Sequence, residues 1–121
     1  MKIKDMLPLS REQFKTEVFK IYFGKCIFCG EKAVDAHHIL DRSLFKSGGY
    51  YLHNGVPVCE KHHWDCEKDV YLPEEIRKIA KIEEIVLPSG FDPHRLYDKF
   101  GKDLGPVPYD RTSIRRTTIL F

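Results

Sequence analysis

Two short pairs of ligand-type residues constrain this chain more than any other feature. Cys26 and Cys29 form a C-x-x-C pair, and Cys59 and His62 form a C-x-x-H pair further along the chain. Each spacing lets one metal ion take both side chains, and together the pairs supply the four nitrogen and sulfur ligands of a tetrahedral structural zinc. The sequence therefore predicts one closed zinc site that joins two distant segments.

Two other interpretations of the cysteines remain open. Cys66 is a rival fourth ligand, although chelation together with Cys59 is easier for a residue three positions away than for one seven positions away. The cysteines could also be small buried side chains, which is a common fate of free thiols.

Disulfides are not expected, because residues 1–14 lack the apolar run of a secretory leader. No stretch resembles a membrane span, and we expect a reducing, cytoplasmic setting in a cell or a virus-infected host.

The length of 121 residues predicts a single domain over 1–121, with a core thin enough to benefit from a metal staple. Residues 1–25 and 93–121 each carry a net charge of +3, whereas 26–72 and 73–92 each carry −2. Basic flanks of this kind could grip a polyanion, although a solvated charged surface would have the same composition.

Hydrophobic periodicity and cap residues predict an α+β fold. The expected elements are a helix at 11–22, a strand at 33–40, an edge strand at 56–58, helices at 59–69, 73–85 and 93–100, and an extended stretch from 104. These elements divide the chain into an N-terminal helical segment, a core, a helical brace and an extended basic tail, at 1–25, 26–70, 71–103 and 104–121.

Inside the predicted zinc frame lies a second group of polar residues: His37, His38, Asn54, His63 and Glu67. His63 and Glu67 are one helical turn apart, so both could reach one cation. A histidine that stays off the metal can act as a general base, because its ordinary pKa is near the operating pH. A base and a cation are the parts that phosphodiester cleavage needs. Neighbouring strand residues point to opposite faces, however, so His37 and His38 converge only if the strand ends or bulges there.

The ordered runs C-x-x-C, D-A-H-H-I and N-G-V-P-V-C-x-x-H-H lie within residues 26–67, about a third of the chain. In this order they resemble the HNH endonuclease family, particularly its zinc-stapled, McrA-like branch. The resemblance implies a small ββα-metal core with a structural zinc, in which a hairpin carries the first histidine and the asparagine and a helix carries the last histidine. The N-terminal helix and two C-terminal helices would flank this core.

The resemblance also implies roles for individual residues. His38 would be the general base that activates water, and Asn54 would pin the loop that orients it. The catalytic divalent cation would be bound by His37 and His63, with Glu67 at a position where some relatives have another histidine. Mg²⁺, Mn²⁺, Ni²⁺ or Zn²⁺ could serve, because imidazole accepts transition metals as readily as hard ions. The zinc staple would be Cys26, Cys29, Cys59 and His62.

The implied activity is metal-dependent hydrolysis of phosphodiester bonds in nucleic acid, with double-stranded DNA as the expected partner and 5′-phosphate and 3′-hydroxyl ends as products. Candidate phosphate contacts are Lys15, Lys20, Arg111, Arg115 and Arg116, although solvated surface positions explain these side chains equally well. The apolar end at 119–121 could dock on a second copy of the chain and form a homodimer.

Two other classes of protein remain as alternatives. One is a non-catalytic zinc-binding module for nucleic acid or protein, which the joint presence of both candidate catalytic histidines, the asparagine and the zinc staple disfavours. The other is a different metal-dependent hydrolase. The sequence offers no phosphate-cradling glycine loop, carboxylate pair or serine nucleophile elbow in support of it.

Overall fold

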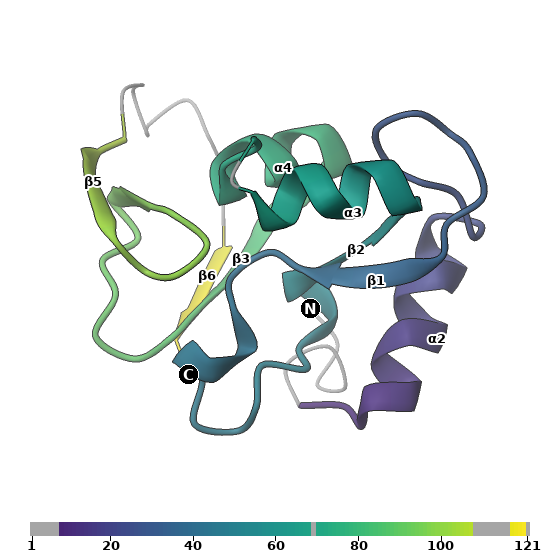
Figure 1. Ribbon diagram of the computed structural model, residues 1–121. Coiled ribbons are helices and arrows are strands. Elements are labelled where there is room, and N and C mark those ends of the chain that lie inside the picture. The colour runs from purple at the N-terminus through teal and green to yellow at the C-terminus, as the bar shows by residue number, and fades with distance from the viewer. Residues whose placement is uncertain (1–7, 69, 108–116, 121) are drawn as a thin grey trace.

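The computed structural model describes residues 8–68, 70–107 and 117–120, the last four by their backbone (Figure 1). Its elements are, in order, α2 (Arg11–Ile21), β1 (Asp35–His38), β2 (Gly55–Val58), α3 (Glu60–Glu67), α4 (Pro73–Ala80), β3 (Glu84–Leu87), β4 (Arg95–Tyr97), β5 (Asp103–Pro106) and β6 (Thr117–Leu120). The predicted mixture of helices and strands is confirmed. Within these residues, no helix combines the length and the apolar character that crossing a membrane requires.

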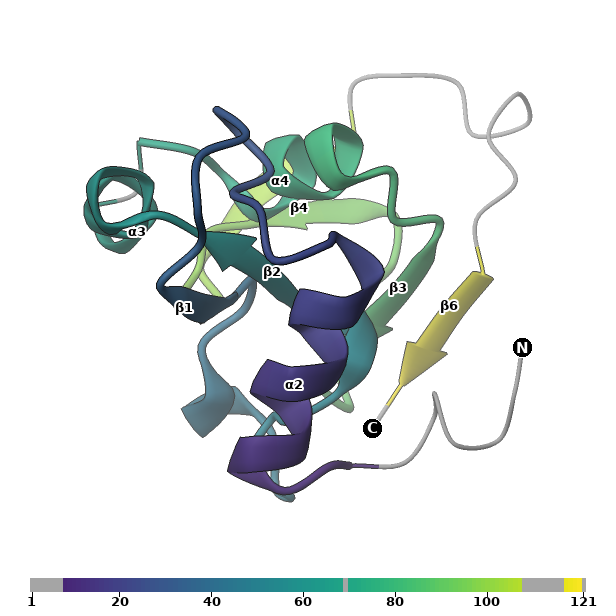
Figure 2. The same cartoon turned by 90° about the vertical axis from the view of Figure 1, so that its right-hand side faces the viewer.

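An antiparallel pair of short strands forms the centre of the molecule. In β1 and β2, His37 lies opposite Val56 and His38 lies opposite Gly55. The helix α2 lies against one face of the pair and α3 lies against the other (Figures 1 and 2). Because strand side chains alternate between faces, His38 contacts α2 through Phe14, whereas His37 contacts α3 through His63.

The helix α2 begins at a reciprocal cap. The hydroxyl of Ser10 accepts a hydrogen bond from the backbone of Gln13, whose side chain accepts one from the backbone of Ser10. Phe14 and Val18 are buried against the strands. The close packing of α2 on β2 requires glycine at position 55, since a Cβ there would lie 2.3 Å from Cζ of Phe14. The predicted helix at 11–22 is confirmed to within one residue at its end.

The second strand leads directly into α3, and its residues help to form the core. Ile39, Val56, Val58, Cys66 and Ile76 are all buried in one cluster beneath α3 and α4. Complete burial of aliphatic side chains of this size stabilises the fold by about 1.5–3 kcal/mol each. Because β2, α3 and the residue that directly follows β1 share this cluster, these elements are held in fixed relative positions.

The predicted helix at 73–85 is too long. The structure ends α4 at Ala80, because Lys81 adopts a left-handed backbone conformation with φ 59°. Residues 84–87 instead form β3, which pairs in parallel with β6 (Figure 2). The buried run Ile85, Val86 and Leu87 suits a strand, and its partner lies far along the chain.

The predicted helix at 93–100 is wrong. Residues 95–97 form β4, which pairs with β5 in an antiparallel hairpin, so the segment 71–103 contains one helix rather than two. The stretch predicted to be extended from residue 104 contains the strands at 103–106 and 117–120, and strand backbone is extended. The backbone at 119–120 is paired with β3 within the same chain, and Phe121 lies outside the described residues.

Candidate functional site

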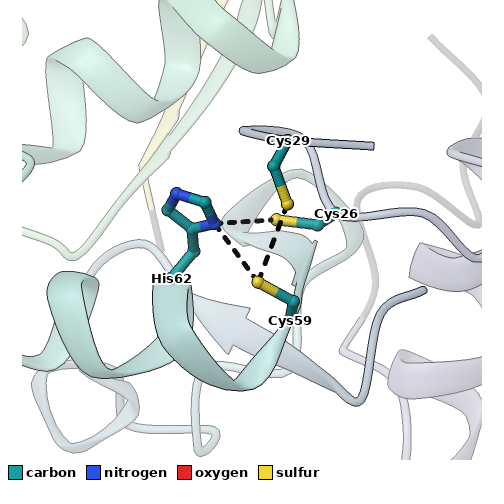
Figure 3. Close-up of side chains that lie close together, drawn as sticks. All are labelled: Cys26, Cys29, Cys59 and His62. Atoms are coloured by element: carbon teal, nitrogen blue, oxygen red, sulfur yellow. Dashed lines mark hydrogen bonds between the residues drawn. The ribbon is translucent and has the colours of Figure 1, made fainter. Parts of the chain in front are cut away.

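The first candidate site is the cluster of Cys26, Cys29, Cys59 and His62, whose ligand atoms all lie within 4.8 Å of one another (Figure 3). Nδ1 of His62 is 3.2 Å from Sγ of Cys59 and 3.6 Å from Sγ of Cys26, and Sγ of Cys29 is 3.8 Å from Sγ of Cys59. Tetrahedral zinc with sulfur ligands at about 2.3 Å requires ligand separations of about 3.8 Å. These donors could therefore hold a structural metal ion such as zinc.

Local backbone geometry brings the four ligands together. The backbone amide of Gly30 donates to the carbonyl of Cys26 over 2.9 Å, which closes a tight turn around the first pair. Cys59 is the N-cap of α3, so His62 lies in the first turn of the helix. The ring of His62 also stacks on Phe28, with 5.1 Å between the ring centroids. The turn and the helix start thus present two ligands each.

Cys66, the rival ligand, lies outside this cluster. Its side chain is 1% exposed in the hydrophobic core beside Ile39 and Val58. Burial raises the pKa of its thiol to about 12, so the thiol stays protonated and is a poor metal ligand. The predicted set with His62 as fourth ligand is therefore the set that the structure brings together.

The second candidate site is formed by His37, His63 and Glu67, whose ligand atoms also lie within 4.8 Å of one another. Oε1 of Glu67 is 3.4 Å from Nδ1 of His37 and 3.4 Å from Nε2 of His63. Burial, followed by the charge of Lys99, holds the pKa of His37 well below its ordinary value, so its ring is neutral at neutral pH. Neutral imidazole is the form that binds metal ions.

The surroundings of the His37 ring are consistent with a metal ion at this site. It is 1% exposed, and neither of its nitrogens has a hydrogen-bond partner among the described residues. Buried nitrogen atoms without partners are rare and costly in folded proteins. A cation held by His37, His63 and Glu67 would satisfy one of them, so the donor set fits a divalent ion with nitrogen and oxygen ligands.

His38 points away from His37, as strand alternation requires, and packs between aromatic rings. Its ring is stacked on Phe14 at 4.6 Å between centroids and meets the edge of Tyr50 at 5.2 Å. Burial and, next, the guanidinium of Arg42 lower the pKa of His38 to about 4. The imidazole of His38 is therefore neutral at neutral pH and has a fixed orientation.

One cavity of about 280 Å³ joins His38 to the second candidate site, because His38, His63 and Glu67 all line its wall. Three acidic residues contribute to this wall: Asp35, Asp41 and Glu67. Four basic residues also contribute to it: Arg11, Lys15, Arg42 and Lys99. The cavity therefore combines a neutral imidazole, a candidate cation site and basic side chains.

The basic residues predicted to contact phosphate fall into three groups. Lys15 lines the cavity. The side chain of Lys20 is 71% exposed outside the cavity and lies 3.7 Å from Glu17. Arg111, Arg115 and Arg116 lie outside the described residues.

Sequence patterns did not indicate Arg11, Arg42 or Lys99 as parts of the site. Arg42 donates a hydrogen bond of 2.6 Å to the hydroxyl of Tyr50, the aromatic neighbour of His38. Lys99 reaches the cavity from the loop between β4 and β5, a region predicted to be helical. Arg11 and Lys99 come from segments far from His38 in the sequence, whereas Arg42 follows His38 by four residues.

Asn54 is buried, and its side chain bonds to the backbone of Leu40, two residues after His38. It does not line the cavity. Its position is therefore that of a residue holding the backbone beyond β1 rather than one that reaches the cavity itself.

Comparison with known proteins finds no matching family model, no matching curated protein and no matching solved structure. What the chain does must therefore be argued from its own residues.

Proposed function

We propose that this protein is a metal-dependent endonuclease that hydrolyses phosphodiester bonds in DNA and uses the site arrangement of HNH nucleases. The observation that supports this proposal best is the shared cavity, which His38 lines together with His63 and Glu67. The order of the elements also fits this proposal. The strand β1 carries His38, its antiparallel partner β2 begins directly after Asn54, and the helix α3 that follows carries His63.

His38 is the proposed general base. Hydrolysis requires a group that removes a proton from the attacking water, and a neutral imidazole can accept one through a ring nitrogen. Burial keeps this ring neutral at physiological pH, and the stack on Phe14 keeps its plane fixed. A pKa near 4 makes it a weaker base than an ordinary histidine but leaves almost all of it in the active form at neutral pH.

The proposed ligands of the catalytic cation are His37, His63 and Glu67. The proposed ligands of a structural zinc are Cys26, Cys29, Cys59 and His62. A divalent ion at the first of these sites would supply positive charge to the phosphate and to the departing oxygen. The four cysteine and histidine ligands leave no open position on a tetrahedral ion, so the zinc would stabilise the fold and take no part in the chemistry.

The basic side chains around the cavity support a polyanionic substrate. Arg42 and Lys15 line the wall that also contains His38. Arginine and lysine contact nucleic-acid phosphates independently of base sequence, so these residues would place the backbone of the substrate over the base. Acidic residues in the same wall become compatible with phosphate once a divalent cation is bound.

The experiment is cleavage of supercoiled plasmid by protein that retains zinc but has lost weakly bound metal, with Mg²⁺, Mn²⁺, Ni²⁺ or Zn²⁺ added back. We expect nicked or linear product from the wild type, and about 10²–10⁴-fold less from His38→Ala. His94→Ala serves as the matched control, because His94 is exposed and lies outside the cavity.

The outcome also separates the alternatives. If zinc-loaded protein binds DNA and yields no product with any of the cations, the non-catalytic module is the better interpretation. Cleavage of structured RNA but not of DNA would keep the chemistry and change the substrate. Full activity of His38→Ala with the cation that supports cleavage by the wild type would refute the role of that residue.

A further inference from the structure

The loop between β4 and β5 places a buried lysine beside the second candidate metal site. The side chain of Lys99 is only 7% exposed, and its Nζ lies 2.7 Å from Oε2 of Glu67. Lysine is almost never buried to this extent without a partner for its charge. Lys99 lies outside the β1–β2–α3 unit that carries the other site residues.

The backbone fixes the position of this lysine. The carbonyl of Lys99 accepts a hydrogen bond of 2.8 Å from the amide of Asp41, three residues after His38. The carboxylate of Asp98 accepts hydrogen bonds of 2.9 Å from the amides of Phe100 and Lys102, which closes the loop. The lysine is therefore tied to the segment just after β1 by its backbone and to α3 by its ammonium group.

The two oxygens of Glu67 have different neighbours. Oε2 accepts the hydrogen bond from Lys99, whereas Oε1 lies 3.4 Å from a ring nitrogen of both His37 and His63. Glu67 is the last residue of α3 and its side chain is 44% exposed. A glutamate at such a position could turn into solvent unless another group restrained it.

We propose that Lys99 is a positioning residue for the cation site: its ammonium holds Oε2 of Glu67, so that Oε1 stays beside the two imidazoles as a ligand. Hydrogen bonds from a second layer of residues commonly orient carboxylate ligands in this way. The inference rests on the proposed function only in requiring that His37, His63 and Glu67 bind a cation. It assigns a role to the β4–β5 hairpin, which no sequence motif explains.

Lys99 also carries a positive charge that would repel a divalent ion, so the two effects predict opposite results. If orientation dominates, removal of Lys99 weakens binding of the ion, and a neutral hydrogen-bond donor at position 99 partly restores it. If repulsion dominates, both replacements tighten binding. We expect orientation to dominate, because Glu67 is exposed enough to leave the site once Oε2 loses its partner.

The test measures Mn²⁺ affinity of the zinc-loaded full chain from the electron paramagnetic resonance signal of free Mn²⁺. Mn²⁺ suits this purpose because it binds nitrogen and sulfur ligands more weakly than zinc does and will not displace it. His63→Ala identifies the site, since it should abolish the uptake. Lys102→Met is the matched control, because Lys102 is an exposed lysine in the same hairpin.

We expect Lys99→Met to weaken Mn²⁺ binding by about 10–100-fold, Lys99→Gln to weaken it less, and Lys102→Met to leave it unchanged. In a Glu67→Ala background, Lys99→Met should cause no further loss, because the lysine acts through that carboxylate. Unchanged zinc content and circular dichroism would show that each variant is folded.

The inference would be overturned if Lys99→Met bound Mn²⁺ as tightly as the wild type or more tightly. It would also be overturned if Lys99→Met lowered the Mn²⁺ affinity further in the Glu67→Ala background. Absence of Mn²⁺ uptake by the zinc-loaded wild type would also overturn it. A different result would refute the proposed nuclease alone. If Mn²⁺ uptake depends on Lys99 but no nucleic acid is cleaved, the positioning role stands and the nuclease activity does not.

Discussion

The side chain of Asn54 forms two hydrogen bonds with the backbone of Leu40. Its Oδ1 accepts from the amide of Leu40 over 3.0 Å, and its Nδ2 donates to the carbonyl of Leu40 over 3.0 Å. The carbonyl of Asn54 also accepts a hydrogen bond of 2.9 Å from the amide of Ile39. These bonds extend the pairing of β1 with β2 beyond His38, so the backbone on the C-terminal side of this histidine is held in place.

Replacement of Asn54 should therefore destabilise the protein. Asn54→Ala leaves a buried amide and a buried carbonyl of Leu40 without partners, which should lower the free energy of unfolding by about 2–5 kcal/mol. Asn54→Asp can still accept from the amide but cannot donate to the carbonyl, and it introduces a buried charge. Urea unfolding at saturating zinc measures both effects, and a change in Asn54→Ala below about 0.5 kcal/mol would contradict the importance of these bonds.

His38 should titrate far below an ordinary histidine. Burial and then Arg42 lower its pKa from 6.5 to about 4. Between these two values the unfolded chain binds a proton that the folded chain does not, so this residue makes the free energy of unfolding fall as the pH falls from 6.5 toward 4. A nuclear magnetic resonance titration of the His38 ring in zinc-loaded protein should give a midpoint near 4. A midpoint near 6.5 would show that the ring is not desolvated.

Replacement of Arg42 tests the second cause of this shift. Arg42→Gln removes the positive charge beside His38, so the midpoint of the titration should move upward while burial still keeps it below 6.5. An unchanged midpoint would mean that the charge of Arg42 does not contribute to the shift.

Patterns that depend on near neighbours predicted the structure well. The C-x-x-C and C-x-x-H spacings placed their ligands correctly, because a turn and a helix start fix the geometry within a few residues. The capping pair Ser10 and Gln13 likewise marked the start of α2. In each case the physical cause lies within three residues of the pattern.

Features that depend on a partner strand or on a contact with another segment were missed. Residues 84–87 form a strand because they pair with 117–120, and Arg95–Tyr97 forms one because it pairs with Asp103–Pro106. Lys99 became part of the site through contacts with Glu67 and Asp41. Helical periodicity over a few turns cannot indicate such pairing, so the predicted helix at 93–100 was wrong and the role of its lysine could not be foreseen.

Two cysteine substitutions should separate metal binding from core packing. Cys26→Ala removes one of the four proposed zinc ligands, so it should lower the zinc content and reduce the free energy of unfolding by several kcal/mol, on the order expected when a structural zinc is lost. Cys66→Ala removes a buried thiol outside the cluster and should keep one zinc per chain. Elemental analysis by mass spectrometry, together with thermal unfolding, measures both properties. Loss of zinc from Cys66→Ala but not from Cys26→Ala would show that the proposed ligand set is wrong.

Two lysines on the same helix should differ in their effect on DNA binding. Lys15 lines the cavity, whereas Lys20 is exposed outside it and lies near Glu17. If substrate phosphates lie over the cavity, Lys15→Ala should weaken binding and make the dependence of log affinity on log salt concentration shallower by about 0.9, the value for one duplex phosphate contact. Lys20→Ala should change neither quantity measurably. Fluorescence anisotropy with a labelled duplex, in a His38→Ala background that prevents cleavage, gives both values. Equal losses in the two variants would mean that DNA is attracted by the general charge of α2 rather than bound at the cavity.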